Sequence, residues 1–274
     1  MSLADVVALA LAEDLGAGDL TAEAVVPEEA RAVAVIEQRA PGVVFGLDAA
    51  RETFAQAGDG LTFDALVPEG EWRNGGEAAR IEGAAHAILA GERVALNFLG
   101  RLSGIATLTA QYVKAVEGTD ARILDTRKTT PGLRALEKAA VVAGGGVSHR
   151  AGLHDAILVK ENHAALAGGV GEAARRAVEG RGSAQFVEAE VESLAELDEV
   201  LEAGVDRILL DNMPPAELRE AVARTGARAE LEASGGITLA NVREVADTGV
   251  DFISVGALTH SAPALDLSLL LAPR

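Results

Sequence analysis

From about residue 122 to the end of the chain, short apolar runs alternate with amphipathic segments. The apolar runs lie at 123–124, 156–159, 186–187, 208–210, 229–233 and 252–255, and the segments between the later runs lie at 193–203, 215–224 and 239–248. These segments are rich in alanine and glutamate, which is typical of surface helices. Strands that alternate with helices indicate parallel βα units. Because no GxGxxG turn opens the first helix, the repeated units favour a barrel over an open sheet.

The first hundred residues follow a different pattern. It predicts a helix at 3–15 that ends at Gly16, β segments at 32–37 and 42–45, a turn-rich stretch at 69–77 and a long helix at about 84–118. This mixture is typical of a smaller α+β domain, and the long helix would connect it to the barrel. We therefore expect an N-terminal domain over 1–105, to which the tail 264–274 can return, and a barrel domain over 106–263.

Residues that can do chemistry stand at the ends of the predicted strands. They are Arg127 and Lys128, Lys160, Glu190, Asp211, Ser234 and Gly256. In βα barrels the active site forms at the C-terminal ends of the strands. We therefore expect these residues to meet at one end of the barrel.

Positive charge is concentrated in one part of an acidic chain. The 274 residues carry a net charge of −18, yet Arg127, Lys128, His149, Arg150 and Lys160 fall in three short clusters. A single surface cation is usually just solvated, but a lysine that follows a buried strand seldom lacks an anionic partner. The group predicts a site for a small substrate with several negative charges.

The carboxylates Glu188, Glu190 and Glu192 lie on one face of a predicted strand, and Asp211 follows the next strand. A barrel strand has no solvent-facing side, so at least one of the three acids should point into the mouth. Two carboxylates beside a phosphate suit Mg²⁺, and they could equally bind ribose hydroxyls.

Glycine-rich turns follow the last two predicted strands, at Ser234-Gly-Gly236 and at Gly256. Barrels often bind phosphate in these two loops, where glycine lets backbone N–H groups approach an anion. Among the histidines, His149 stands next to Arg150 in a predicted ligand-facing turn. His86 and His260 read as structural, and His154 and His163 fit either interpretation.

Several classes of function are disfavoured by the composition. An acidic chain without a basic stripe is a poor partner for nucleic acid, and the apolar stretches are too short to span a membrane. The absence of cysteine rules out thiolate catalysis and suits the cytoplasm, as does an N-terminus without a secretion signal. No GxSxG or HExxH motif is present.

Seven motifs together resemble the quinolinate phosphoribosyltransferase family, whose members are also called nicotinate-nucleotide pyrophosphorylases. They are Glu13-Asp-Leu-Gly-Ala-Gly-Asp-Leu-Thr21, Leu96-Asn-Phe-Leu-Gly-Arg-Leu-Ser-Gly-Ile-Ala-Thr107, Asp125-Thr-Arg-Lys-Thr-Thr-Pro-Gly-Leu-Arg134, Gly145-Gly-Val-Ser-His-Arg150, Leu158-Val-Lys-Glu-Asn-His163, Leu210-Asp-Asn-Met213 and Glu232-Ala-Ser-Gly-Gly-Ile237. The resemblance implies an incomplete α/β barrel of the TIM type with a smaller N-terminal α/β sandwich domain. It also implies the conversion of quinolinate and phosphoribosyl pyrophosphate, with Mg²⁺, into nicotinate mononucleotide, pyrophosphate and CO₂ for NAD biosynthesis.

The same resemblance implies roles for individual residues. Arg127, His149, Arg150 and Lys160 would hold the quinolinate carboxylates, together with Arg101 from the second subunit of a homodimer; a hexamer is also possible in this family. Lys128, Glu190 and Asp211 would act on phosphoribosyl pyrophosphate, the two acids also holding Mg²⁺. Ser234, Gly235, Gly236 and Gly256 would bind its 5′-phosphate.

Three other functions remain open for these residues. A relative from molybdenum-transport gene clusters would share the fold and use another substrate. A Schiff-base aldolase would use Lys160 and leave the arginines without a role. A phosphate-binding barrel without activity would bind ligand and not convert it.

Overall fold

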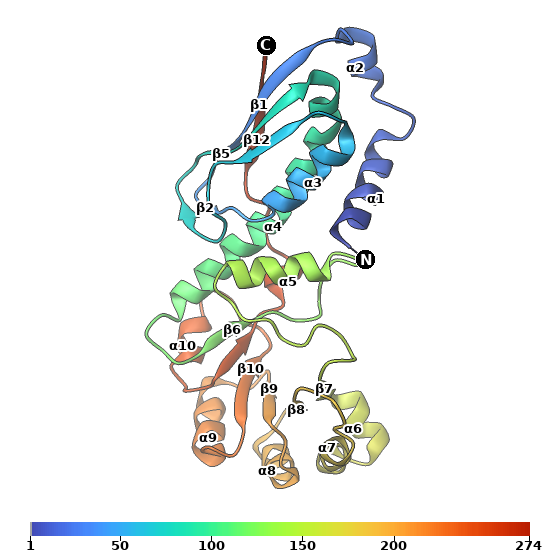
Figure 1. The fold of residues 1–274 in the computed structure, drawn as a ribbon. Helices are drawn as coiled ribbons and strands as arrows, with labels where there is room; N and C mark the ends of the chain where they lie inside the picture. Colours follow the sequence, from blue (N-terminus) through green and yellow to red (C-terminus); the bar gives the residue numbers. More distant parts are fainter. Residues whose placement is uncertain (1) are drawn as a thin grey trace. The chain divides into compact units, whose positions relative to one another are not determined.

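The computed structural model describes residues 2–274, which form two compact units (Figure 1). Unit 1 comprises Met1–Ala110, Thr130–Gly145 and Ser261–Arg274, and unit 2 comprises Gln111–Thr129 and Gly146–His260. Unit 1 contains an antiparallel sheet and unit 2 a parallel one. The predicted fold class, a smaller α/β domain with a parallel α/β domain, is thereby confirmed.

The main sheet of unit 1 has four strands in the order β12-β1-β5-β3. The strands are β1 at Arg31–Gln38, β3 at Thr62–Ala65, β5 at Gly76–Ala84 and β12 at Leu267–Pro273; a separate pair is formed by β2 at Gly42–Val43 and β4 at Trp72–Arg73. Every second residue of β1 is buried, from Ala32 to Gln38, so one face of the strand lies in the core. The C-terminal tail pairs with β1 as an antiparallel edge strand.

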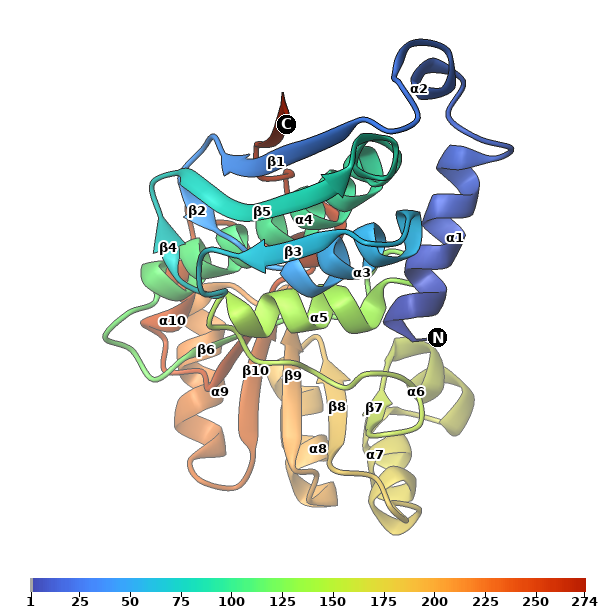
Figure 2. The same ribbon diagram turned by 45° about the horizontal axis from the view of Figure 1, so that its top comes forward.

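Helices cover the buried face of this sheet (Figure 2). They are α3 at Leu47–Ala57 and α4 at Ala85–Ala115. The other helices of unit 1 are α1 at Leu3–Leu15, α2 at Leu20–Val25 and α5 at Arg134–Ala143. Ile36 and Ile81 of the sheet pack with Phe54 of α3 and Leu99 of α4 in one apolar core. The predicted helix at 3–15 is confirmed. It begins at a capping box in which the Ser2 hydroxyl accepts from the backbone N–H of Asp5.

Unit 2 is built on a six-stranded parallel sheet in the order β6-β11-β10-β9-β8-β7. The strands are β6 at Arg122–Leu124, β7 at Ile157–Val159, β8 at Val187–Val191, β9 at Arg207–Asp211, β10 at Glu230–Ser234 and β11 at Phe252–Ser254. The first strand pairs with the last, as in a barrel, but β6 and β7 form the two edges. Val147 makes one parallel bridge to Leu124 at the β6 edge. The barrel is therefore incomplete.

The helices of unit 2 flank its strands (Figure 1). They are α6 at Glu161–Ala167, α7 at Val170–Glu179, α8 at Leu194–Ala203, α9 at Pro215–Thr225, α10 at Val242–Ala246 and α11 at Ala257–His260. In α8 the buried residues Leu197, Val200 and Leu201 recur at helical spacing, so one stripe faces the sheet. None of the helices in residues 2–274 combines the length and the hydropathy that crossing a membrane requires.

Candidate active site

A cavity of about 450 Å³ lies in unit 2 at the C-terminal ends of the strands. This volume suits a small organic ligand. Its lining comprises Thr126, Arg127, Lys128, His149, Arg150, Leu158, Lys160, Glu190, Leu209, Asp211, Glu232, Ser234 and Ser254. The structure thus brings together the cations and acids that the sequence places at the strand ends.

Two arginines stand close together in this cavity. Arg150 is only 7% exposed, and its guanidinium donates to the carbonyl oxygen of Ala156 at 3.2 Å. Burial lowers the pKa of Arg150, and the positive charge of Arg127 lowers it further. Two neighbouring guanidinium groups repel each other, so a ligand with two carboxylates would relieve this repulsion.

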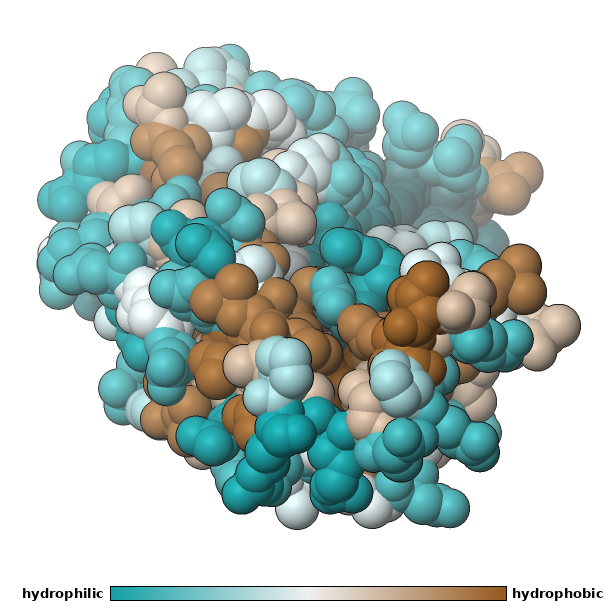
Figure 3. All heavy atoms as spheres, turned by 90° about the horizontal axis from the view of Figure 1, so that it is seen from above, coloured by the Kyte–Doolittle hydropathy of each residue, from teal (hydrophilic) through white to brown (hydrophobic). Residues whose placement is uncertain are grey.

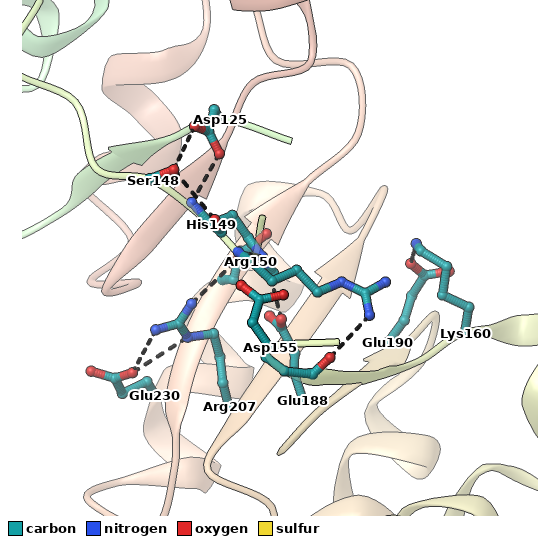
Figure 4. Close-up of polar contacts among 12 residues, drawn as sticks. Asp125, Ser148, His149, Arg150, Asp155, Lys160, Glu188, Glu190, Arg207 and Glu230 are labelled. Atoms are coloured by element: carbon teal, nitrogen blue, oxygen red, sulfur yellow. Dashed lines mark hydrogen bonds and ion pairs between the residues drawn. The ribbon is translucent and has the colours of Figure 1, made fainter. Parts of the chain in front are cut away.

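The turn that carries His149 and Arg150 is fixed by Asp125, which follows β6 (Figure 4). The Asp125 carboxylate accepts from the backbone N–H of His149 at 2.9 Å and from the Ser148 hydroxyl at 3.0 Å. Asp125 is fully buried. The Asp-Thr-Arg-Lys and Ser-His-Arg motifs are therefore joined by hydrogen bonds below the cavity.

The imidazole of His149 points toward two buried carboxylates. Its Nε2 lies 2.9 Å from Glu188 and 3.4 Å from Glu232, and its Nδ1 accepts from the backbone N–H of Arg150 at 2.6 Å. Burial alone would lower the pKa of His149, but the two carboxylates outweigh burial and raise it to about 9. The Arg150 N–H opposes this rise, because a second ring proton would have to displace it from Nδ1. The geometry is that of a ring with its proton on Nε2.

The acids at the mouth form a second group of like charges. Lys160 forms an ion pair with Glu190, and the side-chain amide of Asn212 donates to Asp211 at 2.6 Å. Burial raises the pKa of Asp211, and the nearby Glu190 raises it further, whereas Asn212, Lys160 and Lys128 act in the opposite direction. Bringing a cation to this pair of carboxylates would favour the ionised form of both.

Two glycines of the predicted phosphate loops, Gly235 and Gly256, have little space around them, whereas a Cβ atom at Gly236 would meet nothing within 4 Å. A side chain at Gly235, whose φ is +93°, would overlap the side chain of Asn212. At Gly256 a Cβ atom would lie 3.2 Å from Lys128 Cδ and 3.2 Å from His260 Nε2. Gly256 therefore lies beside Lys128, which lines the cavity, and the histidine interpreted as structural lies next to both.

Arg101 belongs to unit 1 and has a different environment. Its guanidinium donates to Glu137 Oε1 through Nε at 3.1 Å and through a terminal nitrogen at 2.8 Å. Glu137 is completely buried and also accepts from Thr130. Arg101 lines a smaller cavity of about 170 Å³ together with Glu13 and Asp14, both from the first predicted motif.

Two groups of side chains in unit 2 could hold a metal ion. His149, Glu188 and Glu232 bring their ligand atoms within 4.8 Å of one another, but the His149 nitrogen there already contacts both acids. Glu190 and Asp211 offer only oxygen atoms, and both line the cavity. Mg²⁺ prefers oxygen ligands and keeps several waters, so this second pair fits Mg²⁺ better.

Three polar lining residues were not predicted from the sequence: Thr126, Ser254 and Glu232. Each stands in a motif or an apolar run that was recognised. Glu232 opens the Glu-Ala-Ser-Gly-Gly motif, and its alternation with Ser234 along the strand was a usable signal for an inward-facing side chain.

Comparisons with known proteins identify the family. Residues 19–103 match the model of the quinolinate phosphoribosyl transferase N-terminal domain, and residues 105–270 match that of the C-terminal domain. A nicotinate-nucleotide pyrophosphorylase of Mycobacterium leprae is 44% identical over 97% of this chain and 95% of the relative. A probable nicotinate-nucleotide pyrophosphorylase of Bacillus subtilis is 42% identical over 94% of this chain and 89% of the relative.

A solved structure agrees with this result. The nicotinate-nucleotide pyrophosphorylase of Francisella tularensis superposes with a TM-score of 0.94 at 37% identity, covering 98% of this chain and 96% of that one. The resemblance seen in the motifs is therefore confirmed over both units, and the chain belongs to the quinolinate phosphoribosyltransferase family.

Proposed function

We propose that the cavity of unit 2 is where this chain carries out the reaction of its family. Quinolinate and phosphoribosyl pyrophosphate are converted there into nicotinate mononucleotide, pyrophosphate and CO₂, a step of NAD biosynthesis. The observation that carries the proposal is the pair of crowded guanidinium groups, Arg127 and Arg150, in a cavity that Lys160 also lines. A flat dicarboxylate presents one negative charge to each of these guanidinium groups.

Quinolinate is held by its two carboxylates in this proposal. Arg127, Arg150 and Lys160 contact them, and His149 stands beside Arg150 in the same wall. Arg101 would approach from the second subunit of a homodimer. To do so its guanidinium must use N–H groups other than those that donate to Glu137 and to the Ala262 carbonyl oxygen, and arginine has five N–H groups.

Phosphoribosyl pyrophosphate occupies the other side of the cavity. Ser234, Gly235, Gly236 and Gly256 receive its 5′-phosphate, and Lys128 and the acids Glu190 and Asp211 face its ribose and pyrophosphate. Mg²⁺ held by Glu190 and Asp211 would neutralise charge on the pyrophosphate leaving group. Lys128 adds positive charge on the same side, next to Gly256.

The chemistry requires no nucleophilic side chain. The ribose C1 develops oxocarbenium character as its bond to pyrophosphate breaks, and the pyridine nitrogen forms the new bond to C1. The protein contributes by holding both reactants in line and by neutralising their charges. The ribosylated nitrogen then carries a positive charge, which stabilises the carbanion that remains when the adjacent carboxylate leaves as CO₂. A proton on that carbon completes the product.

A homodimer is the assembly that we propose, with a hexamer as the alternative. Large apolar side chains are exposed in both units, including Leu9, Leu153 and Leu166. In the face that Figure 3 shows, hydrophobic residues gather in the middle and hydrophilic residues surround them. Exposed apolar patches with a polar rim are typical of interfaces. A cytoplasmic location stays a prediction, since plant relatives include proteins named as mitochondrial and chloroplastic.

The deciding experiment is a turnover assay with quinolinate, phosphoribosyl pyrophosphate and Mg²⁺, with nicotinate as the control substrate. Nicotinate mononucleotide and CO₂ should form from quinolinate and not from nicotinate. Folded protein that forms no product would favour the molybdenum-associated relative. Trapping of a carbonyl substrate on Lys160 by borohydride would favour the aldolase, and binding without turnover would favour a sensor.

A further inference from the structure

A row of buried charged side chains runs through the barrel of unit 2 below the proposed quinolinate site. We call His149, Glu188, Glu232 and Arg207 the core column. The side chains of the two glutamates are 0% and 1% exposed, and those of His149 and Arg207 are 7% and 11% exposed. Three of these residues do not contact substrate in the function proposed above, so their presence in the barrel needs a separate explanation.

The column begins at the N-terminal end of the sheet. Arg207 is the first residue of β9, and its guanidinium lies between the rings of Phe186 and Phe252, with centroids at 4.8 and 4.0 Å. Its terminal nitrogens reach Glu230 at 2.9 Å and Glu232 at 3.8 Å. The two rings restrict the guanidinium, so Arg207 is a rigid support for the Glu232 carboxylate.

The column ends at the quinolinate site. The same oxygen of Glu232 that faces Arg207 lies 3.4 Å from His149 Nε2, and Glu188 approaches that nitrogen to 2.9 Å. The opposite nitrogen of the ring, Nδ1, accepts from the backbone N–H of Arg150. The contacts of this Glu232 oxygen with Arg207 and His149 are ion-pair contacts and not hydrogen bonds. The backbone of Arg150 is therefore connected to the base of the barrel through one imidazole ring and one carboxylate held by charge.

Keeping two carboxylates inside a barrel has a cost. Burial and the charge of Glu232 raise the pKa of Glu188 to about 7. Replacement of a buried ion group by apolar side chains of similar volume is often neutral or stabilising, so stability alone does not explain these acids. Orientation of His149 and Arg150 is a function that an apolar side chain could not perform.

We propose that Glu232, supported by Arg207, is a positioning residue that holds the His149 ring and, through Nδ1, the backbone amide of Arg150, from which the Arg150 side chain reaches the quinolinate carboxylates. This inference rests on the proposed function of the cavity. Glu232 lines the cavity, but the proposal assigns it no contact with quinolinate, whose carboxylates face the cations. Its removal should therefore weaken quinolinate binding and leave the use of phosphoribosyl pyrophosphate unchanged.

The chain contains a matched control two residues away on the same strand. Glu230 also contacts Arg207, but its side chain is 48% exposed. Its ion-pair partners, Arg122 and Arg207, lie at the base of the barrel. We would compare Glu232→Gln with Glu230→Gln. Glutamine keeps the volume of glutamate but removes the charge. Its amide nitrogen would face the donor nitrogens of His149 and Arg207. Glu232→Asp keeps the charge and withdraws the carboxylate by one methylene, and it serves if the glutamine variant does not fold.

Four quantities would be measured on each intact variant. They are the KM for quinolinate and for phosphoribosyl pyrophosphate, the Kd of phthalate as a dicarboxylate that cannot react, and the ¹⁵N shifts of the His149 ring. For Glu232→Gln we expect the quinolinate KM and the phthalate Kd to rise about tenfold or more. The KM for phosphoribosyl pyrophosphate should stay within about twofold, and the His149 shifts should report loss of the fixed Nε2–H tautomer. For Glu232→Asp the quinolinate KM and the phthalate Kd should lie between those of the wild type and Glu232→Gln. For Glu230→Gln both should match the wild type.

The proposal is overturned if Glu232→Gln lowers the melting temperature while quinolinate and phthalate bind as in the wild type. It is equally overturned if Glu230→Gln and Glu232→Gln change the kinetics alike, because the charge around Arg207 would then be the only cause. Wild-type protein that fails to convert quinolinate contradicts the proposed function instead. Phthalate binding and the His149 spectra would still test the core column in that case.

Discussion

The two ends of the parallel strands in unit 2 differ in how their charged side chains are arranged. At the base, cations meet anions and aromatic rings: Arg207 lies between two phenylalanines beside Glu230, and Arg122 stacks on Phe252 at 4.2 Å. At the mouth, like charges stand together: Arg127 lowers the pKa of Arg150, and Glu190 raises the pKa of Asp211.

This difference separates stability from function within one sheet. Opposite charges at the base satisfy one another in the free protein. At the mouth Lys160 pairs with Glu190, but Arg127 also lies near Arg150 and Glu190 near Asp211, and such like-charge pairs are typical of binding sites. Changes at the base should therefore affect folding, and changes at the mouth should affect catalysis.

The largest effect is expected at the base. Arg207→Ala leaves two carboxylates without their shared cation, one of them buried, and should lower the free energy of unfolding by about 3–5 kcal/mol. Urea denaturation would measure it. Arg175→Ala, which removes an exposed arginine paired with Glu172 and Glu179, is the control and should change the free energy of unfolding far less. Equal losses in the free energy of unfolding for Arg207→Ala and Arg175→Ala would contradict the contrast between the base of the barrel and the surface.

The next effect is at the mouth and concerns activity. Arg127→Ala removes a preorganised donor, and kcat/KM for quinolinate should fall by roughly 10²–10³. The same should hold for Lys160→Ala. The free energy of unfolding of Arg127→Ala should be unchanged or higher, because the repulsion with Arg150 is removed. A loss of activity below about threefold would remove Arg127 from the site.

A smaller effect concerns pH. The pKa values of His149 and Glu188 are raised to about 9 and about 7, so the folded protein binds protons here more tightly than the unfolded chain. This stabilisation is complete below the unfolded pKa and is lost as pH rises through the folded one. The range is about pH 4.5 to 7 for Glu188 and about pH 6.5 to 9 for His149, where the Arg150 N–H on Nδ1 reduces the effect. The free energy of unfolding should therefore fall by roughly 1–3 kcal/mol between pH 4.5 and 9. In His149→Gln the free energy of unfolding should depend less on pH. An unchanged dependence on pH would exclude the core column as its source.

The smallest effect on stability is expected at Arg122, at the exposed edge of the base. Arg122 is half-exposed, and its weak partner Glu230 lies at 3.8 Å, so its ring contact with Phe252 dominates. Arg122→Ala should cost about 0.5–1 kcal/mol in a denaturation experiment, and Arg122→Lys should recover part of that. If Arg122→Ala lowered the free energy of unfolding as much as Arg207→Ala, exposure of the side chain would not explain why the two arginines differ.

The sequence predicts the strand ends well because barrel geometry carries them to one place. Lys160, Glu190 and Asp211 each follow an apolar run, and all three line the cavity. The periodicity also predicts helix 3–15 and the parallel strands. Helix 239–248 was predicted too long: α10 covers only Val242–Ala246, and Asn241 accepts from Thr238 in a turn that precedes it.

Contacts between distant segments could not be read from the sequence. Glu230 and Glu232 share one face of β10, yet one is half-exposed at the base and the other is buried against His149. The difference is one of depth in the barrel, and periodicity gives only the face. In the same way, α5 and the pairing of its buried Glu137 with Arg101 depend on tertiary packing.

A crystal structure of the protein with quinolinate would test the central claim most directly. We predict that both carboxylates lie in the cavity of unit 2, in contact with Arg127, Arg150 and Lys160, with the ring nitrogen facing the Glu190 and Asp211 side. Quinolinate bound outside this cavity, or with its carboxylates directed away from the two arginines, would contradict the account.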